Sequence, residues 1–174
     1  MIQSATSHVL ELGARDETRY VLANCRARDR AEIEATADFD TAAASVLEML
    51  PLAVASSVFR SSGAPAAVAM FHQMTPAALT VSMIATDEWP NVAMDAMRWG
   101  LRVAKPFLIE RGYRRAECRA IDGHKDAIDF LRFLGFEIEA RIPEFGRNGE
   151  TFIQLAWRLC DHTHHEPRRW KSAA

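Results

Sequence analysis

Cysteine is scarce in this sequence: Cys25, Cys118 and Cys160 are the only three in 174 residues, and no two of them form a CxxC pair. An odd number of widely spaced cysteines fits neither a disulfide framework nor a structural zinc site, so we expect reduced thiols in a cytoplasmic protein. An excess of charge of one sign is also missing, because 21 Lys and Arg face 23 Asp and Glu for a net charge of −2. Nucleic acid and anionic membrane surfaces are therefore not expected partners.

Long hydrophobic runs are missing as well. No apolar stretch approaches the ~20 residues that a membrane span needs, and the N-terminus carries no basic stretch followed by an apolar one. We therefore expect a protein that is neither exported nor membrane-anchored. Because 49 % of the residues are hydrophobic, a chain of this length can bury the core of one domain.

The pattern of apolar residues predicts the following elements in the first half, in order: a strand at 8–12, a helix from 14 towards 30, a helix at 40–50, a hairpin with strands at 52–58 and 66–74, and a strand at 79–84. Asp38 or Asp40 is a suitable cap for the second helix, and Pro51 disfavours helix in the residue before it. The Ser61-Ser62-Gly63 segment supplies the hairpin turn.

In the second half the pattern predicts a long helix from 90 towards 111, a strand at 113–121, a short helix at 125–134, and a final hairpin with strands at 136–142 and 151–159. Thr86 or Asp87 is the expected cap of the long helix, with Pro90 in its first turn. Pro106 should kink or divide this helix, and Gly112 should end it. The short helix and the final hairpin should share one core, made of Ala127, Leu131, Leu134, Phe136, Ile153, Leu155 and Trp157.

Residues 161–174 follow no period and are expected to form a flexible tail outside a domain of residues 1–160. Cys160 and the nearby His162, His164 and His165 are metal-ligand types, but they lack the separated pairs that build a closed tetrahedral shell. Such a tail binds Zn²⁺ opportunistically, and we expect no native metal site in the chain.

The segment 121–136, IDGHKDAIDFLRFLGF, carries the most specific motif of the sequence. It resembles the strand, turn and helix that face acetyl-CoA in the GNAT N-acetyltransferases, commonly Asn-x-x-Ala-x-x-Phe-Tyr-x-x-x-Gly-Phe. The matching positions here are His124 for the Asn, Ala127, Phe130, Leu131 for the Tyr, and Gly135-Phe136. The order of predicted elements is also that of the GNAT fold. The resemblance implies an α+β domain with a mixed, mostly antiparallel sheet flanked by helices, acetyl-CoA as cofactor and an amine as acceptor.

The same resemblance implies where the cofactor lies, namely between the strand at 79–85 and the strand at 113–121. The residues expected to bind it are Met83, Ile84, Ala85, Asn91, Val92, His124 and Leu131. His124 and Glu88 are the candidate catalytic residues, because the amine must lose a proton before it attacks. His124 as a cap of the short helix, and Glu88 as a first-turn acid that stabilises the long helix, remain open alternatives.

Two departures from the family pattern leave the function open. The segment 87–93, where the family usually has Arg/Gln-x-x-Gly-x-Gly/Ala around the pyrophosphate, contains no glycine and begins with two carboxylates. Leu131 replaces the tyrosine that often protonates the leaving thiolate, and leucine cannot donate a proton.

One hypothesis is an N-acetyltransferase with a degenerate cofactor motif. The other is a non-catalytic GNAT-fold protein, monomer or homodimer, that binds a protein partner, since the second half also resembles GNAT-like proteins of tailed bacteriophages.

Overall fold

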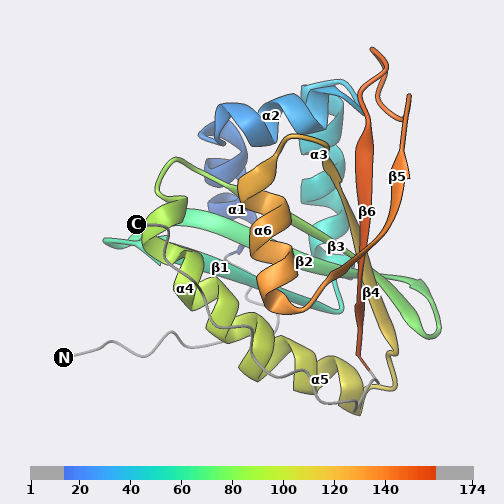
Figure 1. Cartoon of the computed structure of the whole chain (residues 1–174). Helices are drawn as coiled ribbons and strands as arrows, with labels where there is room; N and C mark the ends of the chain where they lie inside the picture. Colours follow the sequence, from blue (N-terminus) through green and yellow to red (C-terminus); the bar gives the residue numbers. More distant parts are fainter. Residues whose placement is uncertain (1–13, 160–174) are drawn as a thin grey trace, which may run out of the picture.

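Figure 1 shows the computed structural model, which describes residues 14–159. Its strands are β1 (Ala55–Ser61), β2 (Ala64–Thr75), β3 (Ala78–Ala85), β4 (Arg115–Ile121), β5 (Glu137–Ile142) and β6 (Phe152–Arg158). They form one six-stranded sheet in the order β1-β2-β3-β4-β6-β5. Neighbouring strands are antiparallel except β3 and β4, which are parallel. The predicted α+β class with a mixed, mostly antiparallel sheet is confirmed.

Helices cover both faces of this sheet. They are α1 (Ala14–Ala23), α2 (Ala27–Glu34), α3 (Phe39–Met49), α4 (Trp89–Trp99), α5 (Lys105–Glu110) and α6 (Lys125–Leu134), with short helical segments at Leu50–Leu52 and Gly100–Ala104. The first three lie on one face and the last three on the other (Figure 1). Within residues 14–159, none of these helices has the length and apolar character needed to cross a membrane.

Alternation along β3 decides which side chains meet which helices. Leu79 and Val81 face α4, α5 and α6, where Leu79 is fully buried beside Leu108. Ile84 faces the opposite way and packs with Val21 of α1. The sheet therefore separates two apolar cores.

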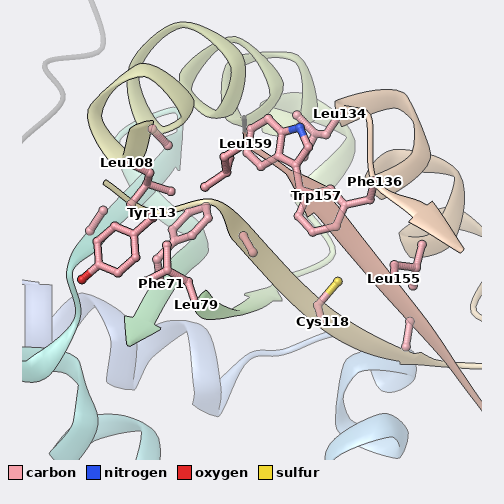
Figure 2. Close-up of a cluster of buried hydrophobic side chains, with 14 of the residues drawn as sticks. Phe71, Leu79, Leu108, Tyr113, Cys118, Leu134, Phe136, Leu155, Trp157 and Leu159 are labelled. Atoms are coloured by element: carbon pink, nitrogen blue, oxygen red, sulfur yellow. The ribbon is translucent and has the colours of Figure 1, made fainter. Parts of the chain in front are cut away.

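The final helix and hairpin pack as the sequence predicts. Five of the seven predicted residues are buried in one cluster, Leu134, Phe136, Ile153, Leu155 and Trp157, and Leu131 packs against it half-buried, whereas Ala127 is half-buried and lies outside the cluster. Figure 2 shows Trp157 beside Leu134 and Phe136, and the rings of Phe136 and Trp157 stack with centroids 5.3 Å apart. Gly135 ends α6 with φ of +99°, a conformation that costs glycine little.

The expected single helix from residue 14 towards 30 is wrong. The chain forms α1 and α2 instead, with a break between Ala23 and Ala27. In this break Cys25 forms an antiparallel bridge with Thr86, and the Arg26 N–H donates to the Ala85 carbonyl oxygen at 2.8 Å. The break thus lets the backbone pair with the end of β3, a partner far away in the sequence.

The long helix is interrupted before Pro106, as predicted. A five-residue π-helical segment, Gly100–Ala104, joins α4 to α5, and the Lys105 N–H donates to the Gly100 carbonyl. Proline removes an N–H and clashes with the carbonyl four residues back, so the widened turn relieves both effects. At the start of α4, Pro90 is the second residue and the Thr86 hydroxyl accepts the Glu88 N–H at 3.2 Å, while Asp87 is exposed.

The predicted strand at 8–12, residues 1–13 of the predicted domain, the tail at 161–174 and the histidines within that tail lie outside the described residues. The expectations for them stay predictions. The helix predicted at 40–50 is observed as α3, with the Asp38 side chain accepting the Thr41 N–H at its N-terminus.

Candidate functional site

Strands β3 and β4 pair over only a short stretch and then part. Their parallel register covers Ala78 to Thr80 on β3 and Arg115 to Glu117 on β4. Beyond these residues the two strands continue without pairing to each other, and we call the space between 81–85 of β3 and 118–121 of β4 the gap. A parallel pair that splays in this way leaves backbone donors and acceptors facing a space inside the sheet.

Backbone groups of β3 line one edge of the gap. The N–H and the carbonyl of Ala85 point away from β2, because they bond to Asp29 and Arg26. Period-two alternation places the backbone groups of Met83 and Val81 on the same edge. Of the three β3 residues expected to bind cofactor, Met83 and Ala85 therefore face the gap through their backbone, whereas Ile84 pairs with Val68 of β2 and points into the core.

Two carboxylates of α2 hold the outer ends of both strands. Asp29 is buried, and its Oδ2 accepts the Ala85 N–H of β3 at 2.8 Å while its Oδ1 accepts Arg26 Nη2 at 2.7 Å. Glu32 Oε2 accepts the Ile121 N–H of β4 at 2.9 Å. Helix α2 thus joins, through side chains, the two strands that no longer pair through their backbones.

His124 lies between these two carboxylates. Its ring is buried, with Nδ1 3.2 Å from Glu32 Oε2 and Nε2 3.7 Å from Asp29 Oδ1. It occupies the residue before α6 but makes no side-chain hydrogen bond to that helix. Among the described residues, Nε2 has no hydrogen-bond partner. The imidazole therefore faces α2 and does not act as a helix cap.

Aromatic rings fill the other side of the gap, beneath α4 and α6. The rings of Trp89 and Phe130 meet edge to face with centroids 4.8 Å apart, and the Arg26 guanidinium lies 5.6 Å from the Trp89 ring centre. A small cavity of about 40 Å³ lies there, bordered among others by Met83 and Leu131. Leu131, which stands at the tyrosine position of the motif, lies against this apolar space.

The start of α4 offers few free backbone donors. The Trp89 N–H bonds to the Thr86 carbonyl, the Asn91 N–H bonds to the Glu88 carbonyl, and Pro90 has no N–H. Glu88 is exposed, and hydrogen bonds from Ser61 and Asn91 hold its pKa below its usual range. Val92 is buried in the core beneath α4. The structure therefore does not bring Glu88 and His124 together: Glu88 faces β1 and His124 faces α2.

A cavity of about 360 Å³ lies on the α2 face of the sheet, at the point where β3 and β4 part. Its lining includes Glu32 of α2, Thr80 of β3 and Arg119 of β4. Val81 and Cys118 also line it, although their positions along the strands face α6. The cavity therefore reaches into the gap, and Val81 borders both this cavity and the small one beneath α6.

Other reactive side chains near the gap are ill suited to nucleophilic chemistry. Burial raises the pKa of the Cys118 thiol to about 12, so the thiol is neutral at physiological pH. The Tyr113 hydroxyl donates to Gln73 at the end where β3 and β4 begin to pair. Within residues 14–159, no three His, Cys, Asp or Glu side chains are arranged so that they could hold a metal ion.

Sequence reasoning missed Asp29 and Glu32. Both lie on a short, polar helix, where acidic residues are ordinarily solvated. Their partners are distant: Ala85, Ile121 and His124 lie 56, 89 and 92 residues away from the carboxylate that contacts each. The three-residue spacing that puts both carboxylates on one helix face is the only local signal.

Comparison with known proteins finds the same architecture in solved structures. Salmonella typhimurium yncA, solved with acetyl-CoA as its cofactor, superposes with a TM-score of 0.65 at 13 % identity, over 94 % of this chain and 99 % of that one. The spermidine N-acetyltransferase SpeG of Vibrio cholerae gives 0.63 at 12 %, over 88 % and 95 %. The Escherichia coli N-acetyltransferase of a ribosomal-protein alanine gives 0.63 at 15 %, over 95 % and 99 %.

No protein-family model and no curated protein matches the sequence. At identities of this order, structural likeness shows the fold and leaves activity to the site. The likeness to these neighbours extends over 94 %, 88 % and 95 % of this chain. The protein therefore has the fold of the GNAT N-acetyltransferases.

Proposed function

We propose that this protein is an N-acyltransferase that uses acetyl-CoA, with the thioester in the gap and the acceptor amine in the cavity on the α2 face. The observation that carries the proposal is that this cavity borders Val81 and Cys118, at the point where β3 and β4 part. A transfer between two bound molecules needs their reacting atoms about 3 Å apart. A gap between strands lets two ligands meet from opposite faces of one sheet.

The residues at the gap fit one part of acetyl-CoA better than the other. Backbone groups of Val81 and Met83 suit the amides of the pantetheine arm, which would add to β3 like a further strand. The pyrophosphate has fewer hydrogen-bond donors available, because the first-turn N–H groups of α4 are bonded within the chain. Asp87 and Glu88 also add negative charge that would repel it. We therefore expect weaker binding than a glycine-rich loop would give, which is the sense in which the motif is degenerate.

Glu32 is the residue to which we assign the amine proton. An ammonium group must lose a proton before its nitrogen can attack a carbonyl carbon, and Glu32 borders the cavity where the amine would lie. His124 holds Glu32 Oε2 and so acts as a positioning residue. Acetyl-CoA, when bound, supplies the activated thioester carbonyl. Its sulfur leaves as a thiolate, and thiols are far more acidic than alcohols, with a pKa near 8.5 for a cysteine side chain, so the leucine at position 131 does not prevent departure.

Glu88 receives no proton-transfer step in this scheme. Its carboxylate is hydrogen-bonded to Ser61 and Asn91 on the side of β1, away from the α2-face cavity. Its part would be indirect, through the charge that it places at the start of α4.

A second function, binding of a protein partner without catalysis, is favoured by one specific observation. The contact of Trp89 with Phe130 fills the space beneath α4 and α6, and Asp29 already occupies the Ala85 N–H. In such a protein the gap would be a closed structural joint. The likeness to GNAT-like phage proteins noted from the sequence belongs to this alternative, as does virion assembly.

Acetyl-CoA binding separates the two functions. A ligand that binds only the native state, at a free concentration of 100 times its dissociation constant, stabilises the protein by about 2.7 kcal/mol. Thermal shift or calorimetry detects this readily. We expect stabilisation by acetyl-CoA, and a Glu32→Gln variant that keeps this binding but loses most acetyl transfer. Glu110→Gln, an exposed carboxylate on α5, is the matched control and should behave like the parent. If millimolar acetyl-CoA stabilises neither the parent nor a Trp89→Ala variant, the enzymatic proposal is wrong.

A further inference from the structure

The cavity on the α2 face presents one anchored carboxylate. Glu32 uses Oε2 for both of its hydrogen bonds, to the Ile121 N–H and to His124 Nδ1. Within residues 14–159 its other oxygen, Oε1, accepts no hydrogen bond, and Glu32 lines the cavity with 26 % of its side chain exposed. A carboxylate that is fixed through one oxygen loses little freedom when a ligand binds the other, so it is preorganised for a hydrogen-bond donor.

Among the described residues, the charged side chains that line the cavity sum to one negative charge. Its charged lining residues are two carboxylates, Glu32 and Glu117, and one guanidinium, Arg119. Glu117 Oε2 is already paired with Arg115 Nε at 2.8 Å. A ligand with one positive charge therefore balances Glu32, whereas a second positive charge would lie near Arg119 and an anion would face two carboxylates.

The mouth of the cavity is apolar. Met74 and Phe145 both line it with 52 % and 41 % of their surfaces exposed. The Phe145 ring packs against Phe152 with centroids 5.0 Å apart, so it is held in place and is not free to turn away. Covering these side chains with a hydrocarbon or aromatic stem would contribute roughly 25 cal/mol for each Å² removed from water.

The volume limits the size of the ligand. A cavity of about 360 Å³ lies near the lower end of the roughly 300–1,000 Å³ that small-molecule sites enclose. A small molecule with a single ring fits such a space with its charged end at Glu32 and its stem between Met74 and Phe145.

We infer that the cavity takes a small primary amine that carries one positive charge on an apolar or aromatic stem, with its ammonium group on Glu32 Oε1. Its role as acyl acceptor rests on the proposed function, but binding of the cation does not. Among the neighbours by fold are enzymes named for spermidine and for a ribosomal-protein alanine, so the fold itself does not select an acceptor. The selection is made by the charges and rings that line this cavity.

Calorimetric titration of the full-length chain with four probes tests the inference, with and without acetyl-CoA. Phenethylamine should bind, and phenylacetate, of similar shape but opposite charge, should not. Spermidine should bind more weakly than phenethylamine, because its further charges meet Arg119. Glu32→Gln should weaken phenethylamine at least about ten-fold, as expected for a lost charged hydrogen bond, while its amide oxygen still accepts the Ile121 N–H. Benzyl alcohol, which has no charge, should bind the parent and Glu32→Gln equally.

Two further variants keep the result interpretable. Phe145→Ala should weaken phenethylamine about three- to ten-fold while the preference for cations remains, since it removes the apolar wall and the ring beneath the Arg119 guanidinium but leaves Glu32 in place. Glu110→Gln should bind all probes like the parent. The inference is overturned if phenethylamine binds Glu32→Gln as tightly as the parent, if phenylacetate binds as tightly as phenethylamine, or if no amine binds in either condition. Amine binding without any acetyl-CoA binding would leave the cation site standing and refute the acyltransferase. Acetyl-CoA binding without any amine binding would refute the cation site and leave the acyltransferase proposal standing.

Discussion

Beneath α4 and α6 the sheet is covered by packed rings and aliphatic side chains, whereas beneath α2 it borders a cavity of about 360 Å³ with charged walls. The first face contains Trp157, Phe136 and Leu155, all buried (Figure 2). The second contains Glu117 and Arg119, which project from the same strand β4 that supplies Cys118 to the first face. One strand therefore supplies the packed core with one set of alternating residues and the walls of the cavity with the other.

The difference shows where substitutions should act on stability and where on binding. On the packed face a lost methylene group leaves a void that its neighbours cannot fill. On the hollow face the side chains already border solvent, so their removal changes charge or contact area without creating a void. Four experiments challenge this division, and the expected effects decrease from one to the next.

The largest effect should come from the packed face. Leu155→Ala removes a fully buried side chain and should lower the free energy of unfolding by about 2–5 kcal/mol. Met74→Ala, at the exposed mouth of the cavity, should change it by no more than about 0.5 kcal/mol. Urea denaturation of both variants gives the comparison. Equal losses would mean that the two faces contribute alike to stability.

Asp29→Asn tests the hydrogen bonds that join α2 to the ends of β3 and β4. The amide keeps its shape but loses the charge that holds Arg26, and its single acceptor oxygen must serve both the Arg26 side chain and the Ala85 N–H. We expect a loss of about 1–3 kcal/mol in the free energy of unfolding, with faster hydrogen exchange at the Ala85 amide. Asp126→Asn is the matched control, because it breaks an exposed pair with Arg28 and should cost almost nothing. An unchanged exchange rate at Ala85 would contradict the assignment.

These two experiments bear on features that differ in how well the sequence predicted them. The final hairpin, α6 with Gly135 and the turn at Gly63 follow from local signals, since period and turn chemistry are set by neighbouring residues. The joint at α2 does not, because Asp29 and Glu32 bind backbone groups 56 and 89 residues away, and a backbone N–H carries no trace in the sequence. The break at residues 24–26 was missed for the same reason.

The likeness of 121–136 to the GNAT motif placed His124 near the end of β4, and the structure agrees on its position. It could not indicate which way the ring faces, because the direction is set by α2, which lies some ninety residues earlier. Leu131 and Pro90, by contrast, gave chemical information directly from residue type. Leucine donates no proton and proline donates no backbone hydrogen bond, whatever the fold around them.

A third experiment addresses the entrance at the start of α4. Asp87→Asn combined with Glu88→Gln should tighten acetyl-CoA a few-fold, because two exposed negative charges near the expected pyrophosphate are removed. The gain should be larger at low ionic strength, where charges are less screened. Calorimetry at two salt concentrations measures it. If the double variant binds acetyl-CoA like the parent at both, the phosphates lie elsewhere.

The smallest effect should appear in the pH dependence of stability. Hydrogen bonds from Arg115 lower the pKa of Glu139 from its ordinary value near 4.5. A carboxyl whose pKa is depressed by folding adds stability above its unfolded pKa and loses it as the pH falls through the folded value. Glu139→Gln should therefore flatten stability measured between pH 6 and about pH 3, by less than about 1 kcal/mol because the pair is partly exposed. If Glu139→Gln leaves the decrease of stability towards acid pH unchanged, the Arg115–Glu139 pair contributes nothing to stability.

The hydrogen bonds that Asp29 and Glu32 make to β3 and β4 also bear on how this sequence tolerates change. Both carboxylates bind main-chain N–H groups, and every residue type except proline presents that same group. The hydrogen bonds from α2 therefore place no constraint on the side chains of Ala85 and Ile121. At half-buried Ile121 many replacements should leave the hydrogen bond intact. The constraint lies on positions 29 and 32 of the helix, where a carboxylate or amide of the right length is needed to accept the hydrogen bond. Among relatives of this chain, the short polar helix should therefore vary less at positions 29 and 32 than the strand ends that it joins.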